Sequence, residues 1–196
     1  MSGAHASSAV AARVRRLEER LIEAGLVSDA ELDDIVARYL AGASPLNGAR
    51  IVARAWTDDG FRARLLRDAN AAIPELGLSM RGGLQEQRLK VVANTRERHN
   101  VVVCTLCSCY PIGLLGPSPS WYKSEAYRSR VVREPRAVLG EFGLVLPADV
   151  EITVWDSSAE SRYLVLPFRP VDTAGLTEEQ LAQLVTREGL IGTAAV

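Results

Sequence analysis

Apolar residues recur at spacings of four and three along the first part of the chain, which is the pattern of helices with one apolar stripe. The first stripe ends near Gly25 and consists of Val10, Val14, Leu17, Leu21 and Ala24. A capping box at 28–31 opens a second helix, and Pro45 opens a third that runs to Trp56. Thin helices with a single apolar face build no core of their own. We therefore expect residues 1–56 to form a helical arm that packs on other parts of the protein or on a partner.

From about residue 80 the pattern changes to short runs of β-branched residues between polar or proline-containing turns, and such runs predict strands. The predicted strands are 88–95, 100–105, 150–157 and 161–170. Helical patterns lie before and between them, at 57–77, 124–134, 135–143 and 177–187. Helices followed by strands mixed with short helices indicate an α+β fold. We therefore divide the chain into the arm, 1–56, and a second domain, 57–196.

Composition excludes several classes of protein. The chain has 196 residues, of which 47% are hydrophobic and 24% charged, and this suits one globular domain with a smaller appendage. A formal net charge of −1 gives no overall field toward nucleic acid or membrane. No apolar run approaches the ~20 residues of a membrane span, and the N-terminal segment lacks the apolar core of a signal peptide. We expect a cytoplasmic protein without nucleic-acid or membrane partners.

All three cysteines lie in one short segment, CTLCSC, as Cys104, Cys107 and Cys109. An odd number of cysteines at such tight spacing does not suit a disulfide framework, and in a reducing compartment it indicates metal or redox chemistry. A structural zinc site takes four ligands from two separated pairs, and an iron–sulfur cluster usually takes four cysteines. The only histidines are His5, near the N-terminus, and His99, which we expect in a loop rather than on a metal. Neither kind of site fits this chain alone.

The segment can instead wrap one ion as a planar claw. The two thiolates of Cys107 and Cys109 and the backbone nitrogens of Ser108 and Cys109 would form three fused chelate rings. Cys104, one tight turn earlier, can reach an axial position, which leaves the sixth position for water or substrate. Binding through an amide nitrogen requires loss of its proton, and this favours a strongly Lewis-acidic trivalent ion over zinc.

With the segments SWYKS, YRSRVVREPRAVL and VWDSSAESRYLVLP, the CTLCSC motif resembles the α subunit of nitrile hydratase from about Asp58 to the C-terminus. The related thiocyanate hydrolases share the metal motif. The resemblance implies a layered α-β-β-α catalytic domain and a non-corrin cobalt(III) ion or, less favoured, iron(III), one per chain. Thr105 matches the cobalt type, because iron-type members carry serine there. The ligands would be Cys104, Cys107, Ser108 and Cys109.

The resemblance also implies oxidised ligands and several partners. Cys107 is expected as a sulfinic acid and Cys109 as a sulfenic acid, both on the first steps of cysteine oxidation. A β-type subunit, either one chain or divided into two, would complete the site, and a metallochaperone or activator protein would load the metal. The reaction would add water to a small-molecule nitrile and give the amide. The nucleophile is either the sulfenate oxygen of Cys109 or hydroxide derived from water.

The resemblance assigns catalytic positions to Cys109 and Ser108 beside the metal and to Gln85 and Arg162 around it. Asp156 lies in the same segment as Arg162, and both are expected to orient the site or to contact the partner subunit. The alternatives are a structural salt bridge between Asp156 and Arg162, and a turn residue at Gln85.

Family members often follow the motif with a tryptophan–proline pair, whereas this chain has Ile112 and Gly113. The smaller side chains predict a roomier pocket that suits bulky or heteroaromatic nitriles. Two rival functions remain open: the metal-bearing subunit of a thiocyanate hydrolase, and a non-catalytic metal-binding or redox-sensing protein.

Overall fold

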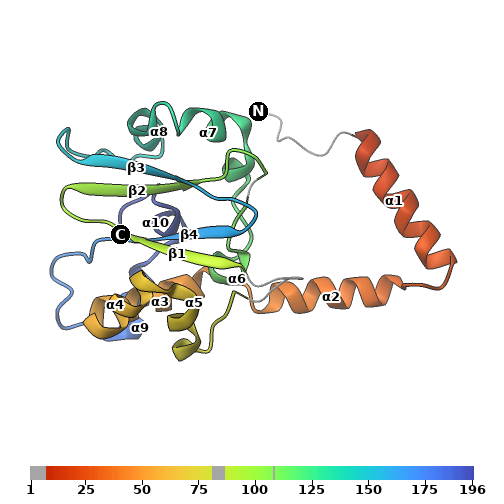
Figure 1. Ribbon diagram of the computed structural model, residues 1–196, viewed down its shortest axis with the longest axis horizontal. Coiled ribbons are helices and arrows are strands. Elements are labelled where there is room, and N and C mark those ends of the chain that lie inside the picture. The colour runs from red at the N-terminus through yellow and green to blue at the C-terminus, as the bar shows by residue number, and fades with distance from the viewer. Residues whose placement is uncertain (1–7, 81–86, 108) are drawn as a thin grey trace. The chain divides into compact units, whose positions relative to one another are not determined.

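The computed structural model describes residues 8–80, 87–107 and 109–196 (Figure 1). The chain divides after Gly42 into two compact units. The first unit holds α1 (Ser8–Glu23) and α2 (Asp29–Ala41), and the capping box predicted at Ser28 is formed with Glu31. None of the helices in the described residues is long and apolar enough to cross a membrane.

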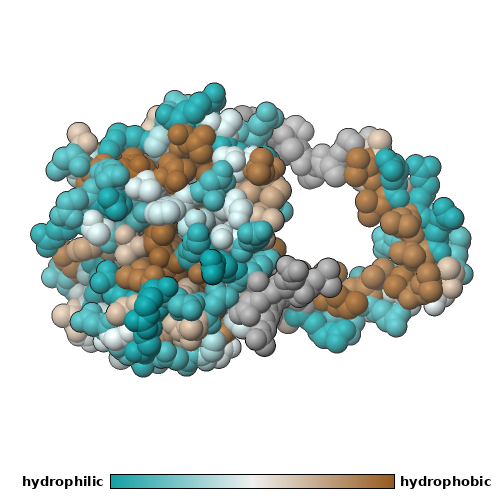
Figure 2. Space-filling view, viewed as in Figure 1, coloured by the Kyte–Doolittle hydropathy of each residue, from teal (hydrophilic) through white to brown (hydrophobic). Residues whose placement is uncertain are grey.

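The apolar stripe of the first unit is exposed. Figure 2 shows apolar residues along both of its helices. Leu17 exposes 59% of its surface, and the other large exposed side chains are Val10, Val14, Leu26, Ile35, Val36 and Leu40. Contiguous apolar surfaces of this kind are typical of interaction sites, and the role of this unit as an arm stays a prediction.

The second unit begins with α3 (Pro45–Thr57), which belongs to its core. Ile51, Val52 and Ala53 are completely buried, and α3 packs against α9 (Glu178–Leu184) and α6 (Ile112–Leu115). The division predicted from the sequence, 1–56 and 57–196, thus differs from the compact units, because α3 was assigned to the arm. Periodicity reveals that a helix has an apolar face but not which surface covers it.

Four parallel-paired strands form the centre of the second unit (Figure 1). The strand β1 (Arg88–Ala93) pairs with β4 (Ser161–Leu166), and β2 (Arg98–Val103) pairs with β3 (Glu151–Asp156). All four were predicted from their β-branched runs, and the mixed α and β character of the fold is confirmed. The remaining helices are α4 (Asp59–Arg67), α5 (Ala69–Ala72), η1 (Ile73–Leu76), η2 (Ser120–Lys123), α7 (Glu125–Arg130), α8 (Pro135–Glu141) and α10 (Arg187–Ile191).

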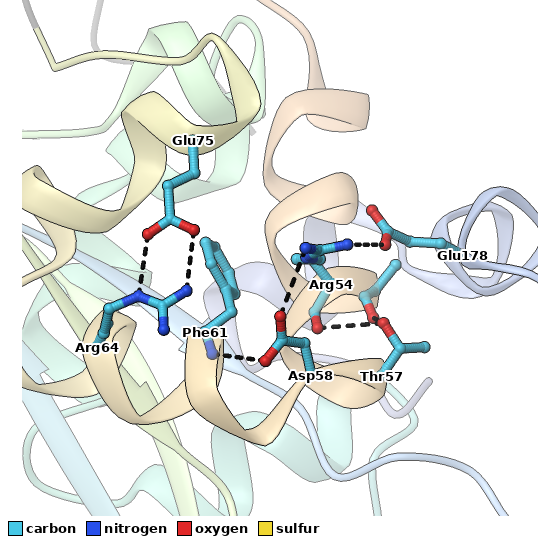
Figure 3. Close-up of polar contacts among 8 residues, drawn as sticks. Arg54, Thr57, Asp58, Phe61, Arg64, Glu75 and Glu178 are labelled. Atoms are coloured by element: carbon cyan, nitrogen blue, oxygen red, sulfur yellow. Dashed lines mark hydrogen bonds and ion pairs between the residues drawn. The ribbon is translucent and has the colours of Figure 1, made fainter.

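Polar contacts near the surface join the helices on the β1 side of the unit (Figure 3). Asp58 caps α4 and pairs with Arg54 of α3 at 3.4 Å, and Arg54 also reaches Glu178 of α9 at 3.4 Å. Arg64 donates two hydrogen bonds to Glu75 of η1, at 3.0 and 2.9 Å. Exposed ion pairs contribute little stability individually, so burial of apolar side chains remains the main force that holds these helices.

The turn after α10 approaches β2 closely. Gly192 has φ +90°, and a Cβ atom there would lie 2.0 Å from the backbone oxygen of Asn100. The Gly192 carbonyl accepts a hydrogen bond from Nε2 of the buried His99, at 2.7 Å. Because a carbonyl only accepts, Nε2 carries the proton, and Nδ1 accepts from the Asn94 side-chain amide at 3.2 Å. His99 lies within β2, whereas the sequence predicted a position in a loop.

We predict that Gly192→Ala destabilises the chain by roughly 2–5 kcal/mol, because a strained backbone conformation and a collision with backbone add together. Gly143 provides the matched control, since its φ is +85° but no atom of the described residues lies within 4 Å of a Cβ built there. Gly143→Ala should lose only the strain, roughly 1–2 kcal/mol. Chemical unfolding of both variants measures the difference, and equal losses would contradict the close approach.

We also predict that the free energy of unfolding falls as the pH drops below about 6.5, the ordinary pKa of histidine. Burial lowers the pKa of His99 in the folded chain, although the hydrogen bond to Gly192 acts in the opposite direction. The unfolded chain therefore binds more protons than the folded chain in this window, and stability is lost as pH falls. His99→Gln should reduce this slope in unfolding curves measured between pH 5 and pH 8. An unchanged slope in the variant would exclude His99 as its source.

Candidate metal centre

The cysteine loop, residues 104–109, begins where two parallel strands end. Cys104 directly follows β2, and the last residue of β2, Val103, lies opposite Asp156, the last residue of β3. The Ser157 N–H donates to the Val103 carbonyl at 2.7 Å and extends this pairing by one step. Parallel strands bring their carboxyl ends to the same edge, and ligands of α/β proteins bind at such edges. The loop thus occupies a position suited to a binding site.

The three thiols face one another across the loop. The Cys107 sulfur lies 3.1 Å from the Cys109 sulfur and 3.7 Å from the Cys104 sulfur. All three sulfur atoms lie within 4.8 Å of one another, and none is in a disulfide. Cys104 and Cys109 are buried, whereas Cys107 is exposed. The chain therefore encloses two of the sulfurs and presents the third to its surroundings.

The surroundings of the loop give the thiols of Cys104 and Cys109 different pKa values. Burial alone would raise the pKa of Cys104, but backbone N–H groups of Cys107, Cys109 and Leu106 lower it to about 7. Burial and the Cys107 thiol raise the pKa of Cys109 to about 12, and the positive charge of Arg162 opposes them. One thiolate forms readily near neutral pH, whereas a second one beside it requires added positive charge.

Polar side chains from three other elements hold the backbone of the loop. Asp156 accepts hydrogen bonds from the Thr105 backbone N–H at 2.9 Å and from its hydroxyl at 2.6 Å. Arg128 of α7 donates to the Thr105 carbonyl at 2.7 Å and to the Leu106 carbonyl at 2.9 Å. The hydroxyl of Tyr122, from η2, donates to the Cys109 carbonyl at 3.0 Å. Tyr122 and Arg128 belong to the segments SWYKS and YRSRVVREPRAVL, which were identified from the sequence. The sequence gave no signal that these two side chains contact the loop.

The expected outer residues have separate partners. Asp156 binds Thr105, whereas the buried Arg162 donates to backbone carbonyls, among them those of Ser158 and Ala159. A salt bridge between Asp156 and Arg162, the structural alternative, is therefore not what these side chains form. Gln85 and Ser108 lie outside the described residues, so their predicted roles stay predictions.

The donor set suits a metal ion but does not match a closed structural site. Within the described residues, the cysteine cluster contains three sulfurs and neither a histidine nor a carboxylate. Tetrahedral zinc and iron–sulfur sites need a fourth side-chain ligand. Thiolates select soft or borderline ions, and positions left vacant by side chains are available for backbone nitrogen and for an exchangeable ligand. The geometry is thus compatible with the claw predicted from the sequence.

Comparison with known proteins agrees with these features. The family model described as nitrile hydratase, alpha chain, matches residues 8–194. The α subunit of the low-molecular-weight cobalt-containing nitrile hydratase of Rhodococcus rhodochrous is 54% identical over 93% of this chain and 87% of its own. Subunit γ of thiocyanate hydrolase from Thiobacillus thioparus is 45% identical over 91% of this chain and 76% of its own.

A solved structure agrees with the sequence relatives. A double mutant of the Fe-type nitrile hydratase from Comamonas testosteroni Ni1 superimposes with a TM-score of 0.87 at 42% identity, over 97% of this chain and 92% of that chain. The resemblance that begins with the CTLCSC motif therefore extends over residues 8–194, almost the whole described chain. From the family model, the relatives and the shared fold together, it follows that the chain belongs to the nitrile hydratase alpha chain family.

Proposed function

We propose that this chain is the metal-binding subunit of a nitrile hydratase, which adds water to a nitrile and yields the amide. The observation that carries the proposal is the group of three sulfurs within 4.8 Å of one another at the carboxyl ends of β2 and β3. The ligands would be the thiolates of Cys104, Cys107 and Cys109 and the backbone nitrogens of Ser108 and Cys109. The layered α-β-β-α order of the catalytic domain belongs to the same proposal.

The proposed ion is one non-corrin cobalt(III) per chain. The Rhodococcus relative is cobalt-containing by name, and Thr105 matches the cobalt type of motif. Iron(III) remains the second choice, because a similar structure is of the Fe type. A bound trivalent ion would supply Lewis acidity toward a nitrile or water. Oxidation of Cys107 to a sulfinic acid and of Cys109 to a sulfenic acid is part of the proposal, and the exposure of Cys107 leaves its sulfur accessible.

The chain's own residues would orient and charge the site. Asp156 fixes Thr105 at the start of the loop through two hydrogen bonds. Burial and the Cys107 thiol raise the pKa of Cys109, and the positive charge of Arg162 opposes this rise and so acts in favour of the anionic form. Gln85 and Arg162 are the proposed outer catalytic residues, and Ser108 contributes a ligand from its backbone.

A β-type subunit would cover the exposed side of this site. Cys107 is exposed, Leu106 exposes 83% of its surface, and the stripe on α1 and α2 leaves apolar side chains uncovered. Such surfaces support a heteromer with one β-type chain or with two shorter ones. A metallochaperone or activator protein would load the ion, and we place the complex in the cytoplasm, where free thiols persist.

Thiocyanate hydrolysis is the second candidate function, because subunit γ of that enzyme is 45% identical to this chain. The nitrile hydratase relative is more similar, at 54%, and this difference favours nitriles. Assay of the assembled complex with thiocyanate and with nitriles separates the two activities. Metal binding without turnover of either substrate would instead support a non-catalytic metal-binding or redox-sensing protein.

We predict that the complex with its β-type partner carries one cobalt ion per chain, and that its 104–109 peptide is heavier by three oxygen atoms. Replacing two ligands in Cys107→Ser/Cys109→Ser should abolish both features and reduce nitrile hydration by more than the about 10–100-fold that outer residues typically contribute. Elemental analysis, peptide mass spectrometry and amide formation measure these effects. The complex produced without cobalt is the control. Undiminished hydration by the double variant would refute the proposed centre.

We also predict a preference for bulky nitriles. Ile112 is half-buried at the start of α6, and beyond the neighbouring residues and the backbone of its own helix no described atom lies within 4 Å of a Cβ built at Gly113. Ile112→Trp should shift the ratio of kcat/KM for a large aryl nitrile against a small aliphatic nitrile by about tenfold toward the small one. Val145→Leu, on a side chain that exposes 86% of its surface, is a control for general effects on activity. A wild-type preference for the small nitrile would contradict the roomier pocket.

A further inference from the structure

Two side chains of this chain hold the cysteine loop by its backbone carbonyls. Arg128 donates through one terminal nitrogen to the carbonyls of Thr105 and Leu106. Tyr122 donates to the carbonyl of Cys109. We call these two residues the carbonyl clamp. One member grips the loop between its first two cysteines and the other grips its last cysteine, so Cys107 is flanked by held backbone on both sides.

The environment of Arg128 indicates that its position is specific. Its Nε atom is buried and finds no hydrogen-bond acceptor in the part of the chain that the structure describes. A buried donor without a partner reduces stability by about 1–3 kcal/mol, and each such group requires an explanation. This unfavourable burial is tolerated while one terminal nitrogen of the guanidinium donates to both loop carbonyls. Its contribution therefore lies in the two carbonyl contacts rather than in a complete set of hydrogen bonds.

Tyr122 is fixed by its packing. The side chain is completely buried, and its ring lies edge-on to that of Tyr110 at 5.1 Å between centroids. It also contacts the rings of Trp121 and Tyr127, at 6.1 and 5.9 Å. Aromatic pairs in this arrangement are favourable beyond their buried area. The hydroxyl is thus held in place before it meets the Cys109 carbonyl.

The held backbone brings the sulfurs together. The Cys107 N–H donates to the Cys104 sulfur at 3.3 Å, and this contact requires the turn at Thr105 and Leu106 that Arg128 holds. Ordering one residue of a free loop opposes binding by about 1–2 kcal/mol. A loop that is already ordered avoids this entropic cost when the ion binds, which is the basis of preorganised sites.

We propose that Arg128 and Tyr122 are positioning residues that hold the cysteine loop ready for its metal ion. The inference rests on the proposed function only in assuming that the three thiols bind a metal. It assigns to this chain a role in forming the centre that is independent of the residues of a partner. The clamp contacts only backbone oxygens, so it acts on the shape of the loop rather than on the metal directly.

The chain contains matched controls for both residues. Arg136 of α8 also donates to two successive carbonyls, those of Leu146 at 3.1 Å and Pro147 at 2.9 Å, in a loop outside the cysteine cluster. The buried hydroxyl of Tyr127 donates to the Val102 carbonyl of β2 at 2.7 Å. The Arg136 variant removes this kind of hydrogen bond from a loop outside the cysteine cluster. The Tyr127 variant removes it from a regular strand.

The test uses the metal-free complex with its β-type partner and cobalt(II) as the only ligand. We predict that Arg128→Met weakens cobalt(II) binding by about 10–100-fold, the usual effect of residues around a metal site. Hydrogen exchange at the Cys107 amide should be faster in this variant before metal is added. Arg136→Met should lower the melting temperature without changing either readout. Arg128→Lys should recover part of the affinity, because an ammonium group provides one point contact in place of the planar fork.

Tyr122→Phe and Tyr127→Phe extend the test with variants that keep the ring and remove only a hydroxyl. We expect Tyr122→Phe to weaken cobalt(II) binding and Tyr127→Phe to affect only thermal stability. If Arg128→Met does not fold, the two Phe variants and Arg128→Lys provide the same test. Equal cobalt affinities in each variant and its matched control would overturn the clamp. Because these readouts need no substrate, wild-type protein that binds cobalt but hydrates no nitrile would refute the proposed function alone.

Discussion

The parallel pairing of β2 with β3 determines where the metal centre lies. It places Val103 opposite Asp156, so the first residue of the cysteine loop leaves the sheet beside a carboxylate that binds Thr105 through two hydrogen bonds. A shift of one residue in register would turn every side chain of the strand to the opposite face. Both the burial of Cys104 and the approach of Asp156 to the loop therefore depend on this one pairing. The rest of the site is built outward from it.

The same arrangement also explains the unequal acidity of the sulfurs. The turn that starts at Thr105 directs backbone N–H groups toward Cys104, and these lower its pKa to about 7 despite burial. Cys109 returns toward the core, where burial and the Cys107 thiol raise its pKa to about 12. In a loop that holds several thiols in a small volume, each deprotonation is opposed by the repulsion of the thiolates already formed. The proposed metal ion of high charge would offset this repulsion, and the sulfurs and the ion would then stabilise each other.

Local features of the fold could be predicted from the sequence because they depend on neighbouring residues. The capping box at Ser28 formed as expected, a helix begins after Thr177 where one was predicted, and the β-branched runs became strands. The burial of α3 could not be predicted, because a helical stripe does not name its partner surface. The three cysteines stood out as a rare spacing of rare side chains. Arg128 and Tyr122 did not, since they bind backbone carbonyls, and every residue of the chain has one.

The exposure of the loop shows what a single chain cannot supply. Cys104 and Cys109 are buried by the chain's own core, whereas Cys107 and Leu106 face outward. Charges interact strongly only where water is excluded, so an open side weakens both metal binding and the activation of a substrate. We propose that a β-type partner closes that side, with the exposed leucine in the middle of the loop as an apolar contact for it. In this proposal the chain orders the inner half of the centre and the partner completes the outer half.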